Sequence, residues 1–321
     1  MSAASPRKQK TKGNCMKKKV RFLWPLCYGL CLAIFTAYVL LDAFVIPRSY
    51  TQTPGVLEEK STSSLVSSGL TNSESATSAV VSDTTYKDSK TSIELKQYRE
   101  NDTNIYVADI ALTESSGLKA ALANNTYGKN ITQKTSVIAE QNNAVLAING
   151  DYYSARSGYV IRDGVLYRET SSDSSQQDLV IKQDGSFEII TEGTVTAKQL
   201  LENGAQQVLS FGPALVEGGE IAVTEDEEVG KAMASNPRTA IGQVDDLHYV
   251  MVVADGRTDE SVGLSLYQLA QFMTSLGVKT AYNLDGGGSS TMVFNGKIIN
   301  QPTTGGNKIS ERKVSDIVYI Q

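Results

Sequence analysis

An aspartate followed by three glycines stands in the segment YNLDGGGSSTMVF, residues 282–294, and three hydroxyl residues come directly after the glycines. Glycine tolerates positive φ and lets the backbone approach a ligand closely, at a cost in conformational entropy when it is ordered. Two interpretations are open: a tight strand–turn–strand, or a backbone cradle for an anion or a sugar with Asp285 at its edge. A nucleotide-binding P-loop is excluded, because no lysine follows the glycines.

The remaining residue types limit the chemistry that the chain can perform. His248 is the only histidine, and the three cysteines, Cys15, Cys27 and Cys31, all lie near the N-terminus. The usual zinc sites, a cysteine nucleophile and a disulfide framework therefore lack their residues in the rest of the chain. Catalysis there must use carboxylates, arginines, hydroxyls and backbone amides. Such groups suit glycosyl chemistry and the recognition of phosphate.

Polar residues interrupt the apolar, strand-like runs at five places, and these are the candidate site residues. They are Asn149, Gly150 and Asp151 in INGDYY, Arg238 in NPRTAIG, Asp255 and Arg257 in VVADGR, Asp285 in NLDGGGSST, and Glu311 and Arg312 in SERKVSD. Each interruption alone is compatible with a turn and a solvated charge. Strand ends at one edge of a sheet can converge on one pocket, so we expect these residues to form a common site.

The elements that must position these residues are short strands joined by hairpins, with a few helices. Hairpin signals occur at 162–164, 183–185, 217–219, 244–246 and 294–296. Helical periodicity predicts helices within 116–128, 134–143, 196–205 and, most clearly, 265–277. This pattern predicts an α+β domain with a largely antiparallel or mixed sheet, to which the last strand, ending at Gln321, returns.

The N-terminal region is typical of a membrane anchor. Residues 1–21 carry eight Lys/Arg and no Asp/Glu, and the next twenty residues, 22–41, carry no charge. Twenty residues of helix can cross a hydrocarbon core of about 30 Å. The basic flank should stay in the cytoplasm, which predicts a single-pass protein with its C-terminal domain outside the cell. A cleaved signal peptide is the alternative, but no good small-residue exit site follows the apolar run.

The predicted organisation is a basic cytoplasmic leader at 1–21, a transmembrane signal anchor at 22–46, a flexible Ser/Thr-rich stalk at 47–93 and one domain at 94–321. The stalk is predicted because its composition offers too little apolar surface to offset the entropy of ordering. Residues 22–321 contain 22 basic and 35 acidic residues. That balance argues against nucleic acid as a partner. An exported part without thiols is also typical of a bacterial surface protein.

The motif order resembles the phosphodiester glycosidase family. NGDYY, PRTAIG, DGR, NLDGGGSSTM and ERKVSD carry this resemblance, which covers about 105–320. The family includes the mannose 6-phosphate uncovering enzyme, an N-acetylglucosamine-1-phosphodiester α-N-acetylglucosaminidase, and bacterial exopolysaccharide-related members. The resemblance implies hydrolysis of a sugar-1-phosphodiester at the anomeric C–O bond. Together with the predicted membrane anchor, it predicts an extracellular, membrane-anchored hydrolase that acts on a surface or exopolysaccharide-type glycan.

The resemblance, taken with the residue inventory, suggests a role for each candidate. Asp285 is expected to face the anomeric carbon or its attacking water, and Asp255 and Glu311 compete for a second acid/base role. Asn149 is expected to bind sugar hydroxyls or an N-acetyl group. Phosphate contacts are expected from the group Arg238, Arg312, Arg257, Gly286, Gly287, Gly288, Ser289 and Ser290.

Two other functions remain open at this stage. A surface module could bind a glycopolymer without cleaving it, although such a module would not need three carboxylates together. A metal-assisted phosphodiesterase could instead cut the P–O bond, with Ca²⁺ or Mg²⁺ held by the acidic residues. No EF-hand-like spacing is present, and the primary expectation is a reaction without a cofactor.

Overall fold

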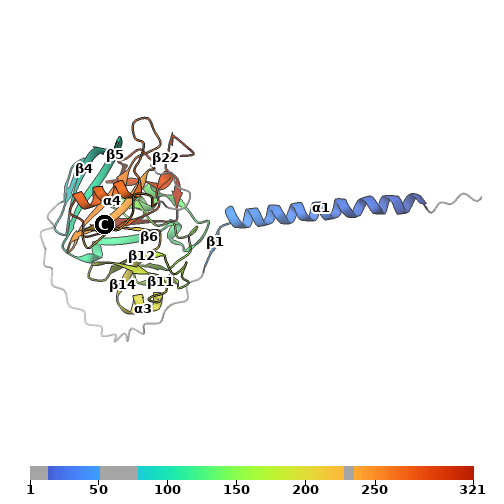
Figure 1. Cartoon of the computed structure of the whole chain (residues 1–321), viewed down its shortest axis with the longest axis horizontal. Coiled ribbons are helices and arrows are strands. Elements are labelled where there is room, and N and C mark those ends of the chain that lie inside the picture. The colour runs from blue at the N-terminus through green and yellow to red at the C-terminus, as the bar shows by residue number, and fades with distance from the viewer. Residues whose placement is uncertain (1–13, 51–78, 228–234) are drawn as a thin grey trace, which may run out of the picture. The chain divides into compact units, whose positions relative to one another are not determined.

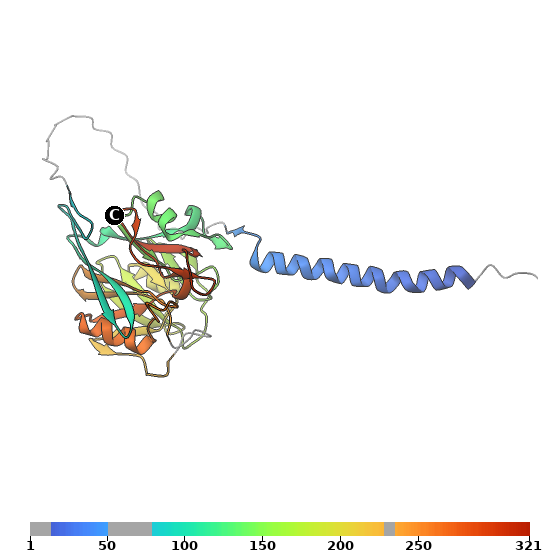
Figure 2. The same cartoon turned by 90° about the horizontal axis from the view of Figure 1, so that it is seen from above.

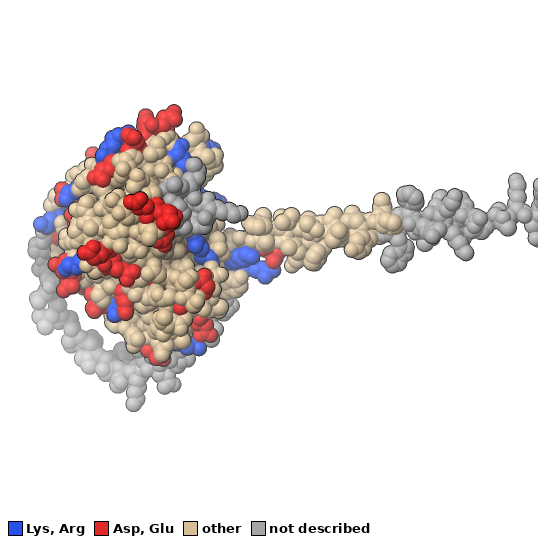
Figure 3. All heavy atoms as spheres, viewed as in Figure 1, with Lys and Arg blue, Asp and Glu red and all other residues tan. Residues whose placement is uncertain are grey.

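The computed structural model describes residues 14–50, 79–227 and 235–321 and divides the chain into two compact units, Met1–Pro47 and Arg48–Gln321 (Figure 1). The first unit contains one helix, α1 (Asn14–Phe44). Its segment Pro25–Phe44 has a mean hydropathy of 1.9, so one N-terminal helix is long and apolar enough to be a signal anchor or a membrane span. Figure 3 shows this segment as almost free of charged side chains.

The second unit consists mainly of three antiparallel sheets. The largest has nine strands in the order β16-β15-β19-β17-β18-β5-β4-β3-β2. Their bounds are β2 (Val80–Val81), β3 (Thr85–Lys87), β4 (Thr91–Glu100), β5 (Thr103–Leu112), β15 (Ala214–Glu217), β16 (Glu220–Ile221), β17 (Arg238–Asp245), β18 (His248–Ala254) and β19 (Thr280–Asn283).

Two five-stranded sheets complete this architecture. One has the order β11-β10-β14-β12-β13 and the other β21-β20-β9-β25-β6. Their bounds are β10 (Val160–Arg162), β11 (Val165–Arg168), β12 (Gln177–Lys182), β13 (Phe187–Thr191) and β14 (Ala205–Leu209), then β6 (Leu118–Leu122), β9 (Leu146–Asn149), β20 (Met292–Phe294), β21 (Lys297–Ile298) and β25 (Asp316–Ile320). The predicted α+β class is confirmed, since the second unit combines these sheets with a few helices. The predicted return of the last strand to a sheet is also confirmed, because β25 lies between β9 and β6.

Three two-stranded ribbons lie outside these sheets. They pair β1 (Arg48–Ser49) with β7 (Gly128–Lys129), β22 (Thr303–Thr304) with β23 (Lys308–Ile309), and β24 (Lys313–Val314) with β8 (Gln133–Lys134). Three short 3-10 helices, η1 (Ser115–Gly117), η2 (Ala123–Asn125) and η3 (Gly287–Ser289), lie in the connections.

Successive side chains of the central strands point alternately into two separate hydrophobic cores. Ile105 and Val107 of β5 face the core that α4 (Leu266–Ser275) covers, whereas Tyr106 and Ala108 face the core shared with the other sheets. Successive side chains of a strand point to opposite faces, so both faces of this sheet are buried. Figure 2 shows the same elements from above.

Among the described residues of the second unit, three short helices pack on the sheets at predicted positions. They are α2 (Thr135–Gln141), α3 (Ala197–Glu202) and α4. In α4, Ser265 forms a capping box with Gln268, and Leu266, Leu269, Ala270 and Met273 are buried, as the periodicity predicts. All five predicted hairpin signals lie between paired strands.

Two expectations differ from the structure. The helix predicted within 116–128 is wrong: Leu118–Leu122 form β6, which pairs with β25 and is mostly buried. Helix-forming residues adopt the strand here because tertiary pairing outweighs local propensity. The domain boundary predicted at 94 also differs, since the sheet already includes β2 and β3 from Val80 onward. Residues 51–78 of the predicted stalk and 1–13 of the predicted leader lie outside the described residues.

Candidate active site

The candidate site residues converge because several strands end at the same sheet edge. In the nine-stranded sheet, β17 begins at Arg238, opposite Ala254 at the end of β18. On its other side β17 pairs with β19, with Ala240 opposite Asn283. The segments that follow β18 and β19, which contain Asp255, Arg257 and Asp285, therefore leave the sheet together at the edge where Arg238 enters it.

The glycine run is a tight turn packed on neighbouring backbone. Gly287 has φ +59° and donates its N–H to the carbonyl of Pro237 at 2.8 Å. A Cβ on Gly286 would lie 2.7 Å from the same carbonyl oxygen, and a Cβ on Gly288 would lie 2.5 Å from Thr304 Oγ1. The glycines therefore permit close approach of the chain to itself, and they place Asp285 and Ser289 next to each other.

The Asp285 carboxylate is held by a hydroxyl and a guanidinium group. Its Oδ2 accepts hydrogen bonds from Ser289 Oγ at 2.5 Å and from Arg312 Nη2 at 2.8 Å. Arg312 also donates to Ser289 Oγ, from Nε at 2.9 Å and from Nη2 at 2.6 Å. Within the described part of the chain, Oδ1 of Asp285 has no hydrogen bond. Arg312 and Ser289 thus fix one carboxylate oxygen and leave the other without a hydrogen bond from the described residues.

The ion pair between Asp285 and Arg312 combines a buried carboxylate with a solvent-accessible guanidinium group. The side chain of Asp285 is 10% exposed and that of Arg312 is 42% exposed. Burial raises the pKa of Asp285 above its ordinary value, and the charge of Arg312 opposes this effect. Asp285 is therefore a poorly solvated carboxylate whose negative charge depends on Arg312.

A second guanidinium group lies on the glycine run. Arg257 follows β18 with φ +64° and donates from Nε and Nη2 to Asn236 Oδ1, at 3.2 and 3.0 Å. A Cβ on Gly287 would lie only 2.7 Å from Arg257 Nη2. Burial lowers the pKa of Arg257, and the charge of Arg312 lowers it further. Two positive groups therefore lie close enough to interact, a geometry suited to a bound anion.

The backbone amides of the turn are only partly available to a ligand. The N–H groups of Gly287, Ser289 and Ser290 donate to carbonyls of the protein. Among the hydrogen bonds of the described residues, none uses the N–H of Gly286 or of Gly288. Backbone contacts to phosphate were expected from Gly286, Gly287, Gly288 and Ser289. Only the N–H groups of Gly286 and Gly288 remain available for such contacts.

Asn149 supports the turn through its own hydrogen bonds. Its Nδ2 donates to the Asp285 carbonyl at 2.6 Å, and its Oδ1 accepts from Thr239 Oγ1 at 2.9 Å and from Thr291 N at 3.2 Å. Asn149 is fully buried. It was expected to bind sugar hydroxyls, but this geometry instead makes it a positioning residue for Asp285.

The two carboxylates expected to assist Asp285 have other partners in the structure. Glu311 accepts from the N–H and Oγ of Ser136, at 3.0 and 2.7 Å, at the start of α2. Asp255 Oδ1 accepts from Asn300 Nδ2 at 3.0 Å and from the Gln301 N–H at 2.9 Å. Burial raises the pKa of Asp255, and these hydrogen bonds oppose the rise. Among the described residues, neither carboxylate shares a hydrogen bond or an ion pair with Asp285 or its partners Arg312 and Ser289.

Arg238 and Ser290, also expected to contact phosphate, are buried beside the turn. Arg238 donates from Nε to the Leu264 carbonyl at 2.9 Å. Ser290 Oγ is buried without a hydrogen-bond partner among the described residues. Their places next to the turn are consistent with support for it.

Two residues of the 150–156 loop interact with the Asp285–Arg312 pair and were not expected from the sequence. The ring of Tyr152 lies 5.7 Å from the Arg312 guanidinium carbon, and Tyr152 has φ +57°. Arg156 lies over the ring of Phe211 at 3.9 Å, and its charge lowers the pKa of Asp285 against the effect of burial. Tyr152 stands in the INGDYY motif, whereas no motif marks Arg156.

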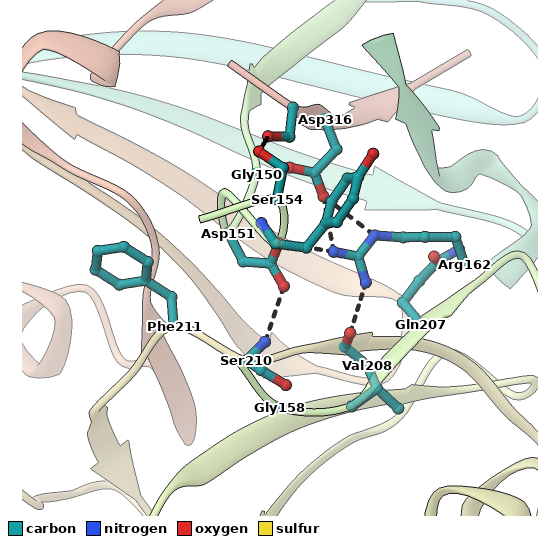
Figure 4. Close-up of polar contacts among 12 residues, drawn as sticks. Gly150, Asp151, Ser154, Gly158, Arg162, Gln207, Val208, Ser210, Phe211 and Asp316 are labelled. Carbon is teal, nitrogen blue, oxygen red and sulfur yellow. Dashed lines mark hydrogen bonds and ion pairs between the residues drawn. The ribbon is translucent and has the colours of Figure 1, made fainter. Parts of the chain in front are cut away.

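A buried ionic network anchors this loop (Figure 4). Arg162 Nη2 donates to Asp151 Oδ1 at 2.8 Å and to Asp316 Oδ2 at 2.7 Å. Asp151 Oδ2 also accepts from the Ser210 N–H at 2.8 Å. Gly150 bridges the network to the candidate site, because its N–H donates to the Asp316 carbonyl and its carbonyl accepts from the Asp285 N–H. Burial, with the neighbouring negative charge of Asp151, raises the pKa of Asp316.

The described residues contain no cluster of three or more His, Cys, Asp or Glu side chains that could hold a metal ion. The site consists instead of one carboxylate, one hydroxyl and two guanidinium groups around a glycine turn.

The family model described as phosphodiester glycosidase matches residues 142–321, more than half of the chain. The chain belongs to the phosphodiester glycosidase family. The family resemblance predicted from the motifs is thereby confirmed. The matched region includes Asp285, Ser289, Arg257 and Arg312.

Relatives with curated descriptions support the family assignment. The chain is 30% identical to the SPbeta prophage-derived uncharacterized protein YomE of Bacillus subtilis, over 60% of this chain and 30% of that protein. It is also 30% identical to the N-acetylglucosamine-1-phosphodiester alpha-N-acetylglucosaminidase of Mus musculus, over 49% of this chain and 33% of that enzyme. The chain thus spans about a third of the length of the curated relatives it matches.

Two solved structures share the fold of this chain. The zebrafish N-acetylglucosamine-1-phosphodiester alpha-N-acetylglucosaminidase catalytic domain, auto-inhibited by its pro-peptide, aligns with a TM-score of 0.58 at 21% identity, covering 72% of this chain and 83% of that chain. A hypothetical protein from Synechocystis aligns with a TM-score of 0.51 at 14% identity, over 73% of this chain and 63% of that chain.

Proposed function

We propose that this phosphodiester glycosidase hydrolyses a sugar-1-phosphodiester at the anomeric C–O bond. The observation that carries the proposal is the Asp285 carboxylate, held by Arg312 and Ser289 beside the Arg257 guanidinium group. These residues lie in the matched family region. The names of three curated relatives describe hydrolysis of an N-acetylglucosamine-1-phosphodiester, which supports the same reaction class here.

The substrate phosphate is proposed to bind at the positive side of the turn. Arg312 and Arg257 offer guanidinium N–H groups, which pair with phosphate oxygens in a planar fork. The N–H groups of Gly286 and Gly288 add neutral donors. These groups hold the negative charge that collects on the phosphate as the C–O bond breaks.

Asp285 is proposed to act on the anomeric carbon through its Oδ1. Arg312 and Ser289 hold Oδ2, so the orientation of the carboxylate does not have to be established during the reaction. Its negative charge stabilises an oxocarbenium-like sugar, and water supplies the new oxygen at the anomeric carbon. The phosphate is a weakly basic leaving group, so it departs with little help from a second carboxylic acid. This fits the separate partners of Asp255 and Glu311.

The proposed location is the outer face of a cell membrane, with a surface or exopolysaccharide-type glycan as substrate. The support is the apolar helix segment Pro25–Phe44, preceded by a basic leader. The lipid-inserted helix and cytoplasmic basic residues would leave the second unit outside. Protease added to intact cells should then degrade the second unit and spare the leader.

The test is hydrolysis of N-acetylglucosamine 1-phosphodiesters by the purified full chain in detergent micelles. Asp285→Asn keeps the size of the side chain but removes its charge, so kcat should fall by several orders of magnitude while substrate binding and the melting temperature change little. Asp246→Asn, at an exposed position in the β17–β18 turn, is the matched control and should retain wild-type activity.

Identification of the phosphate-bearing product separates this reaction from its two rivals. Cleavage of the C–O bond yields free sugar, with the phosphate on the other product, and should proceed in the presence of a chelator. Sugar phosphate as the product, with loss of activity in chelator, would establish the metal-assisted phosphodiesterase instead. Tight binding without any turnover by the wild-type chain would establish a binding module.

A further inference from the structure

A pocket lined by four tyrosines lies apart from the glycine turn. Its volume is about 330 Å³, at the lower end of the range for small-molecule sites. The residues of this tyrosine pocket that matter here are Tyr50, Tyr127, Lys129, Tyr153, Tyr167 and Arg168. Three of them, Tyr50, Tyr127 and Lys129, lie outside the matched family region 142–321, so this pocket is not explained by the family match.

The tyrosine rings form one continuous aromatic cluster around Tyr127. The ring of Tyr127 stacks on Tyr153 with centroids 4.9 Å apart, and it contacts Tyr167 at 5.0 Å and Tyr50 at 5.8 Å. Tyr127 and Tyr153 are buried, whereas Tyr50 is 49% exposed at the outer wall. Aromatic rings with hydroxyl groups offer both an apolar face and a polar edge. A sugar ring, with its C–H face and its hydroxyls, matches both.

The backbone is built to bring Tyr50 to this cluster. Strand β1 pairs with β7, with Arg48 opposite Lys129, and the Tyr50 N–H donates to the Tyr127 carbonyl at 3.1 Å. A Cβ on Gly128 would lie 2.0 Å from the Arg48 carbonyl oxygen. Only glycine allows this approach, so the wall that Tyr50 forms depends on the residue at 128.

The charges of the pocket are positive. Lys129 and Arg168 line it, and no acidic residue stands among the described residues that form its lining. Arg168 Nη1 donates to the Tyr153 carbonyl at 3.0 Å, while its Nη2 is buried without a hydrogen-bond partner in the described part of the chain. Arg168 also lies close enough to Tyr127 for its charge to lower the pKa of that tyrosine against the effect of burial, so a positive group borders the central ring of the cluster.

One loop carries residues of both the pocket and the surroundings of the candidate active site. Tyr153 and Ser154, which also lines the pocket, follow directly on Tyr152, whose ring lies near Arg312. Ser154 Oγ is hydrogen-bonded to Ser315 Oγ at 2.5 Å, three residues after Arg312. A chain-like ligand that reaches the turn can therefore extend along this loop toward the tyrosines.

We infer that the tyrosine pocket binds a phosphate-bearing sugar unit of the glycan, distinct from the unit that reaches Asp285. The rings pack on the sugar, and Arg168 and Lys129 pair with its phosphate. This inference rests on the proposed function only for the identity of the polymer. Binding to the pocket does not require cleavage at Asp285.

The test measures binding of a trimer of hexoses joined by phosphodiesters, by calorimetry, to the full chain in detergent micelles. An Asp285→Asn background prevents turnover of the probe. Tyr50→Ala should raise Kd roughly three- to tenfold, since it removes one aromatic face. Lys129→Gln should also weaken binding. Tyr50→Phe, which keeps the ring, and Lys279→Gln, an exposed lysine paired with Asp245, are the controls and should bind as the background does.

Three results would overturn the inference. One is unchanged affinity in both Tyr50→Ala and Lys129→Gln. A second is equal affinity for a trimer joined by glycosidic bonds without phosphate. The third is a loss of affinity in the variants that appears only when phosphatidylglycerol vesicles replace the trimer as the ligand. That result would show a site for a lipid headgroup. Failure of the proposed function is a separate outcome, because it appears as absent hydrolysis in the wild-type chain whatever the pocket variants bind.

Discussion

Replacing Gly287 with alanine tests whether the glycine turn and Arg257 act as one unit. The new Cβ would lie 2.7 Å from Arg257 Nη2 and 3.3 Å from its guanidinium carbon. Since contacts below about 3 Å do not persist, the guanidinium group must move. That movement breaks its two hydrogen bonds to Asn236 Oδ1, at 3.2 and 3.0 Å. The variant therefore displaces a proposed phosphate ligand without removing its charge.

The expected magnitudes have two parts. The backbone of Gly287 has φ +59°, a conformation that costs an alanine about 1–2 kcal/mol. For a domain of this size, each kcal/mol lowers the melting temperature by about 2–4 °C. The second part is catalytic: misplacement of a phosphate ligand by about 1 Å can lower kcat/KM about 100-fold.

Gly296→Ala is the control that separates the loss of stability from the loss of catalysis. Gly296 also has a positive φ, +73°, but a Cβ there would meet no atom within 4 Å. Both variants should show a similar fall in melting temperature by calorimetry. Only Gly287→Ala should lose hydrolysis of the sugar-1-phosphodiester. The reasoning is refuted if Gly287→Ala retains wild-type kcat/KM, or if both variants lose activity equally.

Two further predictions concern carboxylates outside the glycine turn. Glu311→Gln should lower the free energy of unfolding by about 1 kcal/mol, because Glu311 accepts a hydrogen bond from the Ser136 N–H at the start of α2. Chemical denaturation measures this loss, and kcat should stay near the wild-type value. A fall of several orders of magnitude in kcat would instead assign Glu311 an acid/base role. Asp178→Asn should become increasingly stabilising relative to wild type as pH rises. Burial, with the negative charge of Glu192, raises the folded-state pKa of Asp178 to about 9, far above its unfolded value, so the folded state retains a proton that the unfolded state releases. The stability this proton supplies is complete below about pH 4 and is lost as pH rises toward 9, by at most about 1.4 kcal/mol per pH unit. The melting temperatures of the wild type and of Asp178→Asn, measured between pH 4 and 9, test this prediction. A difference between the two melting temperatures that stays constant with pH would contradict it.

The sequence predicted well those features that local rules determine. The five hairpins follow from turn residues between apolar runs, and α4 follows from its apolar spacing. The convergence of Arg257 and Asp285 was predictable for the same reason, since both follow strands that end at one edge of the sheet. The strand Leu118–Leu122 was not predictable, because only its pairing with β25 reveals it.

The partners of individual carboxylates depend on tertiary contacts that no motif records. Glu311 and Asp255 stand in the same kinds of motif as Asp285, yet Ser136 and Asn300 bind them. The charge of Arg156 acts on Asp285 only because the fold places the 150–156 loop beside it. A motif thus indicated which segments meet, and the fold decides which side chains within them share a site.

The pairing of β1 with β7 has a mechanical consequence. Tyr50 and Val80 are both fixed in the second unit, so the 29 residues between them begin and end on the same folded body. Tension applied to the chain at Pro47 would first load the two-residue strand β1, and only its detachment would pass the load onward. The two-residue pairing of β1 with β7 is therefore the first contact of the second unit that such tension would break.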